Sequence, residues 1–240
     1  MSLDPANDVA EFDAYAHEYD VLLNSSLAIS GESVTYFTDY KIRDLASIWK
    51  QAAADRPQAP RILDFGAGVG ATIPHFQRHF PGSPLTCTDV SRKSLLLAGK
   101  RFGAAASFIP CDLGSLPFPE RQFDIAFASC VFHHIPPENH VTILRELGRV
   151  LMPGGLLFLY EHNPYNPVVV RVVKGCAFDE RAILIPASTL RQRVTLAGFN
   201  QVTSRYRVFF PRAFKWLRRL EDGLTWLPLG VQYYVHGIKP

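Results

Sequence analysis

Residues 61 to about 162 alternate short apolar runs with stretches of helical periodicity. This alternation constrains the fold most, because strand and helix repeating at this spacing form βαβ units and hence a parallel sheet covered on both faces. Five runs are predicted as strands: Arg61–Phe65, Leu85–Asp89, Ala106–Pro110, Phe123–Ser129 and Gly155–Glu161. Helices are predicted between them at 71–80, 91–103 and 137–152. We therefore expect an α/β fold with a doubly wound sheet.

The C-terminal part has a different pattern. After a predicted helix at Ala187–Ala197, two strands are predicted at Gln201–Phe210 and Gly230–Ile238. They are separated only by an aromatic and basic insert at about 211–229, which leaves no crossover helix, so they should be antiparallel neighbours. We expect a mostly parallel sheet of seven strands with one antiparallel strand at its edge.

The first 57 residues are predicted to form a helical cap, and residues 58–240 a Rossmann-like domain. Four apolar side chains recur at i, i+3, i+4 and i+7, namely Phe12, Tyr15, Ala16 and Tyr19. A second helix is expected from about Glu32 to Ala54, before the proline-containing connector Arg56–Pro60. A cap of this length suits a lid over a buried pocket.

Composition is that of an ordinary globular protein, with 48% hydrophobic and 20% charged residues and a net charge of +3. The four cysteines form no C-x-x-C pair and no histidines stand near them at zinc spacing, so we expect buried thiols and no metal site. The chain begins without the basic and apolar pattern of a signal peptide, and no apolar run is long enough to span a membrane. These features favour a cytoplasmic location.

The turn Gly66-Ala67-Gly68-Val69-Gly70 follows a predicted strand and opens a predicted helix. Glycines in this place permit positive φ and let the backbone approach a ligand, while helix N–H groups face anionic atoms. With Ala71 the turn also fits the G-x-G-x-x-A pattern of dinucleotide sites. By itself it leaves open a nicotinamide-dependent oxidoreductase.

Three carboxylates near the turn narrow the choice of cofactor. Asp64 ends the first strand, where it would repel a pyrophosphate but can hold the ammonium group of an amino-acid-like ligand. Asp89 ends the second strand, where it can accept hydrogen bonds from both ribose hydroxyls of either cofactor class. Asp112 follows the third strand and can accept from the exocyclic amine of adenine. The set favours a cofactor that joins adenosine to an amino acid.

With these residues the sequence resembles class I S-adenosylmethionine-dependent methyltransferases. The resemblance covers roughly residues 60–162 and includes Cys111-Asp112-Leu113, the run from Phe123 to Ile135, and Leu147–Gly155. The resemblance implies that the methionine portion of the cofactor is bound by Gly66, Ala67 and Gly68. It implies that ribose and adenine are bound by Asp89, Val90, Asp112 and Leu113, and that Ser129 and Cys130 lie beside the sulfonium. Tyr15 and Tyr19 resemble aromatic residues that close over the cofactor in many members.

Methyl transfer requires a nucleophile placed in line with the activated carbon, and a hydroxyl acceptor is helped by a general base. We consider His133, Glu161 and His162 as candidates, since they follow the fourth strand or end the fifth. Each has an alternative role. His133 can serve a structural purpose or contact the cofactor, and the run Glu161–Asn163 can cap a loop.

The C-terminal part carries six cations interleaved with four aromatic residues: Arg205, Arg207, Arg212, Lys215, Arg218 and Arg219 with Phe209, Phe210, Phe214 and Trp216. A solvated face or a homodimer contact explains such a patch, and so does binding of an anionic small molecule, a lipid headgroup or nucleic acid. The pI of 8.7 gives nucleic acid little support. We predict methyl transfer to an oxygen, nitrogen or carbon of a small molecule; the alternatives are the oxidoreductase and an inactive S-adenosylmethionine-binding protein.

Overall fold

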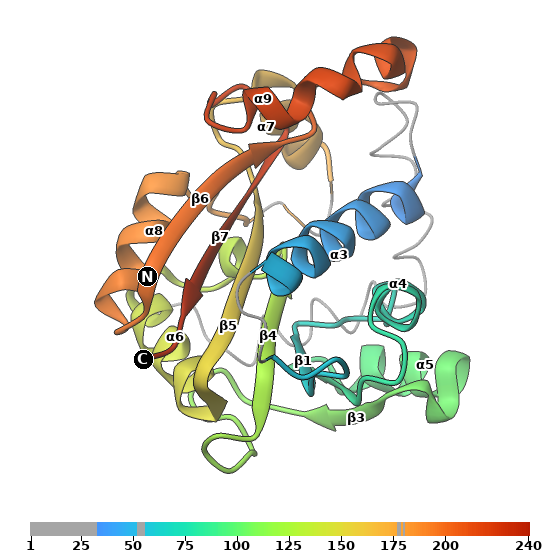
Figure 1. Ribbon diagram of the computed structural model, residues 1–240, viewed down its shortest axis with the longest axis vertical. Coiled ribbons are helices and arrows are strands. Elements are labelled where there is room, and N and C mark those ends of the chain that lie inside the picture. The colour runs from blue at the N-terminus through green and yellow to red at the C-terminus, as the bar shows by residue number, and fades with distance from the viewer. Residues whose placement is uncertain (1–32, 52–55, 177–178, 180) are drawn as a thin grey trace.

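The computed structural model describes residues 33–51, 56–176, 179 and 181–240 (Figure 1). One seven-stranded sheet has the order β3-β2-β1-β4-β5-β7-β6. Its strands are β1 Ile62–Phe65, β2 Leu85–Asp89, β3 Ser107–Pro110, β4 Phe123–Ser129, β5 Leu151–His162, β6 Asn200–Arg207 and β7 Gln232–Ile238. The α-helices are α3 Val34–Gln51, α4 Ile73–His79, α5 Arg92–Phe102, α6 His140–Val150, α7 Pro167–Lys174, α8 Ala187–Leu196 and α9 Glu221–Leu224. Short 3-10 helices lie at Gly103–Ala105, Phe132–His134, Pro137–Asn139 and Arg212–Leu220, the last labelled η6.

The sheet confirms the predicted class, with seven strands of which one is antiparallel. Strands β1 to β5 pair in parallel, whereas β7 runs antiparallel to both β5 and β6. The antiparallel strand lies second from the edge rather than at the edge itself. Burial explains this order: Gln232–Val235 of β7 is buried, whereas β6 has no buried residue. The strand with the more apolar sequence therefore occupies the interior place.

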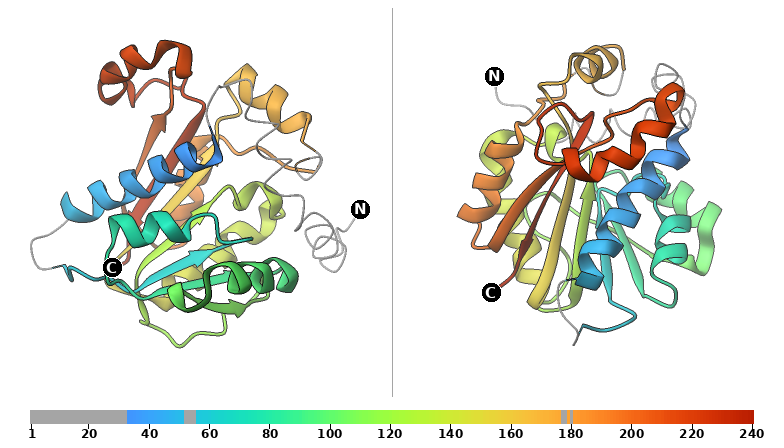
Figure 2. Two further views of the ribbon diagram at one scale, coloured as in Figure 1. Left: turned by 90° about the vertical axis from the view of Figure 1, so that its right-hand side faces the viewer. Right: turned by 45° about the horizontal axis from the view of Figure 1, so that its top comes forward.

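Helices cover both faces of the sheet, as Figure 2 shows. On one face α6 and α8 bury Leu144, Leu147 and Leu190 against residues such as Leu157 of β5. On the other face α3 and α4 lie over the centre of the sheet and α5 packs against β2 and β3, with Ile42, Leu45, Ile73, Phe76 and Leu95 in one apolar cluster. Helix α3 is thus part of the layer on the sheet. The division of the chain into a cap at 1–57 and a domain at 58–240 stays a prediction.

Two elements differ from the sequence prediction. Helix α6 ends at Val150, two residues before the predicted end, and Leu151 already pairs with Phe123 of β4. The sequence Met152-Pro153-Gly154, predicted to end the helix, therefore lies inside β5, where the pairing with β4 shifts register. Helix α7 was not predicted. The sequence does contain a signal for its first residue: the Asn166 side chain accepts hydrogen bonds from two backbone N–H groups of the first turn, and Pro167 occupies the first helical position.

The predicted N-terminal helix with Tyr15 and Tyr19 lies outside the described residues. The described part of the second predicted helix is α3, Val34–Gln51. Among the described residues, no helix is long and apolar enough to span a membrane.

Candidate active site

The glycine turn lies directly after β1, against the carboxyl end of β2. The N–H groups of Gly66 and Ala67 donate to the Thr88 carbonyl, which fixes the turn to the neighbouring strand. Gly66 has φ +76°, and a Cβ there would meet Val131 Cγ2 at 2.4 Å. Gly68 has φ +54° with no atom within 4 Å of where a Cβ would stand. The first glycine is required by packing, and the second leaves backbone facing open space that a ligand can fill.

Asp89 and the turn position one another. The Gly68 N–H donates to Asp89 Oδ2 and the Ser91 N–H donates to Asp89 Oδ1, each at 2.8 Å. These two backbone donors fix the orientation of the Asp89 carboxylate at the carboxyl end of β2. Val90 lies beside it, half-buried.

Asp64 is almost fully buried at the end of β1, with 1% of its surface exposed. Burial raises the pKa of its carboxyl to about 7; the hydrogen bond from the Thr72 hydroxyl opposes this rise and the nearby Asp89 charge adds to it. Near neutral pH this group therefore exists in both forms, and a cation beside it would hold it ionised.

The predicted adenine residues follow β3, the strand that pairs with β2. Asp112 is exposed and forms an isolated bridge with Ser115, whereas Leu113 is half-buried and packs against the core. Their place at the carboxyl edge agrees with the location of ligands in doubly wound sheets.

Ser129 ends β4 and Cys130 follows it, and both contact a residue that the sequence analysis does not predict. Lys41, on α3, is buried and its Nζ donates to Ser129 Oγ at 2.7 Å and lies 3.5 Å from Cys130 Sγ. Cys130 has φ +58°, in the left-handed region, which costs energy for a residue with a side chain. Burial raises the pKa of its thiol, but the neighbouring His162 and Lys41 side chains outweigh burial and lower that pKa to about 6. No local signal in the sequence connects Lys41 with β4.

Glu161 and His133 form a buried pair at the carboxyl ends of β5 and β4. Glu161 Oε1 accepts from the N–H groups of Val131 and Phe132 at 3.1 and 2.8 Å, and Glu161 Oε2 lies 2.6 Å from His133 Nδ1. Burial lowers the pKa of the His133 imidazole, but the Glu161 and Asp179 carboxylates outweigh it and raise that pKa to about 10. His133 is therefore protonated at neutral pH.

Asp179 lies on the other side of the histidine pair. Its Oδ1 is 3.5 Å from His133 Nε2 and 3.3 Å from His134 Nε2, and burial of Asp179 is outweighed by these contacts, which lower the pKa of its carboxyl. The three ligand atoms lie within 4.8 Å of one another, so of the described residues this trio has the composition of a transition-metal site. A protonated imidazole between carboxylates satisfies the same atoms without a metal.

His162 is half-buried, and its ring centroid lies 5.4 Å from that of His133. The next residue, Asn163, caps the loop, because its Nδ2 donates to the carbonyls of Pro228 and Gly230 at 3.1 and 2.7 Å. The predicted run at 161–163 thus has an inward carboxylate, a capping amide, and an imidazole beside Cys130.

Arg207, one of the six cations in the predicted basic patch, points inward. Its Nε and Nη2 donate to Asp44 of α3 at 2.8 Å each, and the Tyr160 hydroxyl donates to the same carboxylate at 2.7 Å. This bidentate pair joins α3 to β5 and β6, so Arg207 belongs to the interior.

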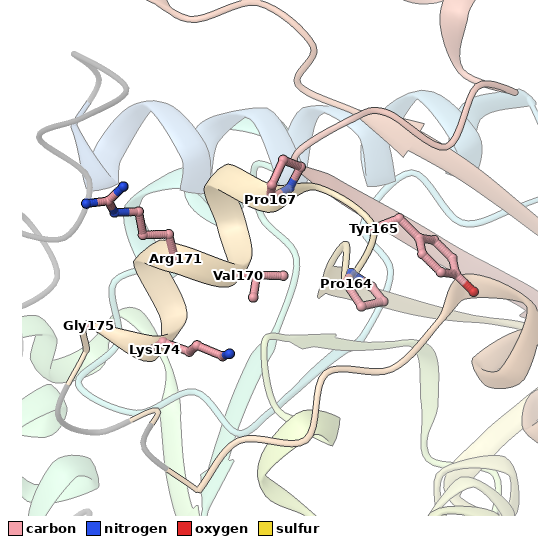
Figure 3. A pocket seen from close by; sticks show the side chains of 7 residues that line it. All are labelled: Pro164, Tyr165, Pro167, Val170, Arg171, Lys174 and Gly175. Carbon is pink, nitrogen blue, oxygen red and sulfur yellow. The ribbon is translucent and has the colours of Figure 1, made fainter.

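An open groove of about 660 Å³ lies beside α7 and is lined by Pro164, Tyr165, Pro167, Val170, Arg171, Lys174 and Gly175 (Figure 3). Figure 3 shows the Lys174 side chain extending from α7 on the side of Pro164, whereas the Arg171 side chain extends the other way. The groove begins two residues after His162, on the segment that leaves β5.

Comparisons with known proteins agree with this geometry. Residues 62–155 match a family model described as a methyltransferase domain. A ubiquinone/menaquinone biosynthesis C-methyltransferase UbiE from Desulfotalea psychrophila is 29% identical, over 64% of this chain and 57% of its own length. The UbiE protein of Bordetella parapertussis is 29% identical over 92% of this chain and 88% of its own length.

The chain spans only part of other curated relatives. It covers 65% of the Hahella chejuensis UbiE protein, and 36% and 37% of tRNA N(3)-cytidine methyltransferases from Danio rerio and Gallus gallus. A Thermotoga maritima protein described as a S-adenosylmethionine-dependent methyltransferase shares the fold with a TM-score of 0.68 at 16% identity, over 96% of this chain and 99% of that one.

Residues 62–155 thus match a methyltransferase domain, the whole chain is similar to UbiE C-methyltransferases, and its fold is that of an S-adenosylmethionine-dependent methyltransferase. The resemblance seen in the sequence and the predicted cofactor are thereby confirmed. The similarity to UbiE proteins extends over nearly the whole chain, including the strands beyond the matched domain.

Proposed function

We propose that the protein transfers the methyl group of S-adenosylmethionine to a small-molecule acceptor. The observation that carries this proposal is the meeting of two unlike groups of residues at the carboxyl edge of the sheet. Anchored carboxylates and a glycine turn occupy the ends of β1 and β2, and a buried cluster of lysine, cysteine and histidine occupies the ends of β4 and β5. The first group suits the cofactor, and the second suits proton transfer at an acceptor.

In this proposal the cofactor lies across the glycine turn. Gly66, Ala67 and Gly68 face its methionine portion, and Asp64 holds its ammonium group. Asp89 and Val90 hold the ribose, Asp112 and Leu113 contact adenine, and Ser129 and Cys130 lie by the sulfonium. The open space at Gly68 and the two backbone donors that fix Asp89 support this placement. When bound, the cofactor supplies a methyl carbon already activated by positive sulfur.

His162 is the proposed general base. Glu161 has both oxygens engaged inside the protein, and His133 carries a proton between two carboxylates, so neither is free to accept another. His162 is partly accessible, and it lies beside Cys130 at the carboxyl end of the sheet. Glu161 and His133 then act as positioning residues, which hold the end of β4 against β5.

We further propose a carbon acceptor in a small anionic molecule. Carbon is supported by the UbiE relatives, which are named C-methyltransferases and one of which aligns with nearly the whole chain. A negative charge is supported by Lys174, which lines the groove beside α7 and extends on the side of Pro164 (Figure 3). Replacing Lys174 with Ala should raise KM for an anionic acceptor and leave kcat unchanged, because a contact away from the reacting carbon contributes equally to ground and transition states.

The decisive experiment combines calorimetry with product analysis. Titration with S-adenosylmethionine should show saturable binding, whereas NAD should show none; binding of NAD alone would revive the oxidoreductase. Incubation with a cofactor carrying a trideuterated methyl group and a panel of quinol, phenol, amine and carboxylate acceptors should then yield a labelled product by mass spectrometry. Cofactor binding with no transfer to any acceptor, including one from a cell extract, would favour the inactive binding protein.

A further inference from the structure

The C-terminal insert, residues 211–229, exposes apolar side chains to an unusual degree. Five of the ten large hydrophobic side chains that are exposed in the described part of the chain lie there. They are Phe214 at 51%, Trp216 at 69%, Leu220 at 57%, Trp226 at 70% and Leu229 at 59% exposed. Apolar side chains gathered in one short segment, unlike single exposed leucines, mark an interaction surface.

The exposure does not come from a detached segment. Glu221 at the base of the insert is buried, and its Oε2 accepts from the Tyr40 hydroxyl of α3 at 2.8 Å. Glu221 Oε1 accepts from the N–H groups of Phe209 and Phe210 at 3.1 and 3.2 Å. The Arg218 guanidinium lies 4.6 Å from the centre of the Tyr36 ring. The inner side is fixed to the body of the protein by polar contacts, and the outer side carries the tryptophans.

Cations accompany the apolar side chains. In the short segment Arg212–Leu220, which is kinked at Phe214, Arg212 and Lys215 are exposed together with Phe214 and Leu220. Arg219 adds a further exposed cation, and no acidic residue occurs between Arg212 and Leu220. Tryptophan and phenylalanine beside arginine and lysine are the side chains that insert into the boundary between lipid headgroups and acyl chains.

We propose that the C-terminal insert binds the surface of an anionic lipid bilayer. Phosphate headgroups would neutralise Lys215 and Arg219 while the two tryptophans enter the interface. A symmetric contact with a second copy of the chain would instead bring the same cations against one another, which is unfavourable. Nucleic acid would use the cations but would leave the leucines without a partner.

The location of the insert gives this binding a consequence for the active site. Figure 1 shows the insert at the same end of the molecule as α7, which follows the carboxyl end of β5. A bilayer bound there lies next to the edge of the sheet that carries His162 and Cys130. The proposal concerns membrane binding alone and does not depend on methyl transfer.

Sedimentation with lipid vesicles tests the proposal. The full chain should bind vesicles containing one quarter phosphatidylglycerol, bind phosphatidylcholine vesicles weakly, and be released by high salt. The emission of Trp216 and Trp226 should shift to shorter wavelength on binding. The double variant Trp216→Ser/Trp226→Ser should lower the partition coefficient at least about tenfold, and Lys215→Gln/Arg219→Gln should lower it only for acidic vesicles.

Matched controls separate these effects from unfolding. Leu96→Ser/Leu196→Ser changes two leucines of similar exposure on α5 and α8, at 67% and 59%, and Lys50→Gln/Lys100→Gln removes two exposed charges elsewhere. Both controls should bind vesicles like the parent, and all variants should keep the parent affinity for S-adenosylmethionine. The proposal is overturned if the parent does not bind acidic vesicles, if the tryptophan variant binds equally well, or if that variant only dissociates a dimer in analytical ultracentrifugation.

Discussion

The cofactor half and the acceptor half of the carboxyl edge are built in different ways. The cofactor half uses short segments in which neighbours in sequence contact one another, such as Ser91 with Asp89 and the glycine turn with the end of β2. The acceptor half joins residues from distant parts of the chain: Lys41 from α3, Cys130 after β4 and Asp179 after α7. A local motif can be recognised from sequence, whereas a cluster assembled by packing depends on every element that brings it together.

The largest expected effect tests that dependence on packing. Replacing Arg207 with Ala leaves the Asp44 carboxylate buried without its bidentate partner, and should lower the free energy of unfolding by about 3–5 kcal/mol. Thermal unfolding measures the loss. Arg205→Ala, on the same strand but exposed, is the control and should change stability little. Equal stability of both variants would mean that the Arg207–Asp44 pair contributes little to holding α3 on the sheet.

The acceptor half is tested next by replacing His162 with Ala. Loss of the proposed base should lower kcat by about a hundredfold, within the range for general base catalysis, and leave cofactor affinity unchanged. Steady-state kinetics on the acceptor found by mass spectrometry and calorimetry with S-adenosylmethionine measure the two quantities. If kcat is retained in His162→Ala and lost in His133→Ala, the base is His133 and its proton must leave during the reaction.

The cofactor half should respond in the opposite way. Asp89→Ala removes charge-assisted hydrogen bonds to ribose and the acceptor for the Gly68 N–H, so it should weaken S-adenosylmethionine binding at least about tenfold. Calorimetry gives the affinity, and Asp222→Ala, an exposed carboxylate of the insert, serves as control. An unchanged affinity would mean that ribose is held by other groups.

A smaller effect is expected from pH. The carboxyl of Asp64 has its pKa raised to about 7, and an ammonium ligand favours the ionised form. Affinity should therefore be full above pH 7 and fall as pH decreases through 7, by roughly tenfold from pH 8 to pH 6. Calorimetric titrations across this range measure the slope, and Asp64→Asn should abolish it. A slope that persists in Asp64→Asn would assign the titration to another group.

The strands of the cofactor half could be predicted from the sequence, whereas the contacts of the acceptor half could not. Strands β2 and β4 have the predicted bounds, and β1 and β3 fall within one residue of theirs, because each is an apolar run bounded by turn residues. The sequence also indicated Glu161 and His133 as candidate site residues, since polar side chains at the carboxyl ends of buried strands lie where this fold binds ligands. Their pairing and their protonation depend on burial, which the sequence does not state.

By itself, the sequence determined the alternating architecture, the cofactor class and the residues around the glycine turn, because all of these rest on contacts between near neighbours and on strand periodicity. Only the tertiary structure decided that β7 lies inside the sheet, that Arg207 points inward to Asp44, and that Lys41 reaches Cys130. The physical reason is the same in each case. These features depend on which surfaces are buried against one another, and burial and charge pairing between distant segments are properties of the packed chain.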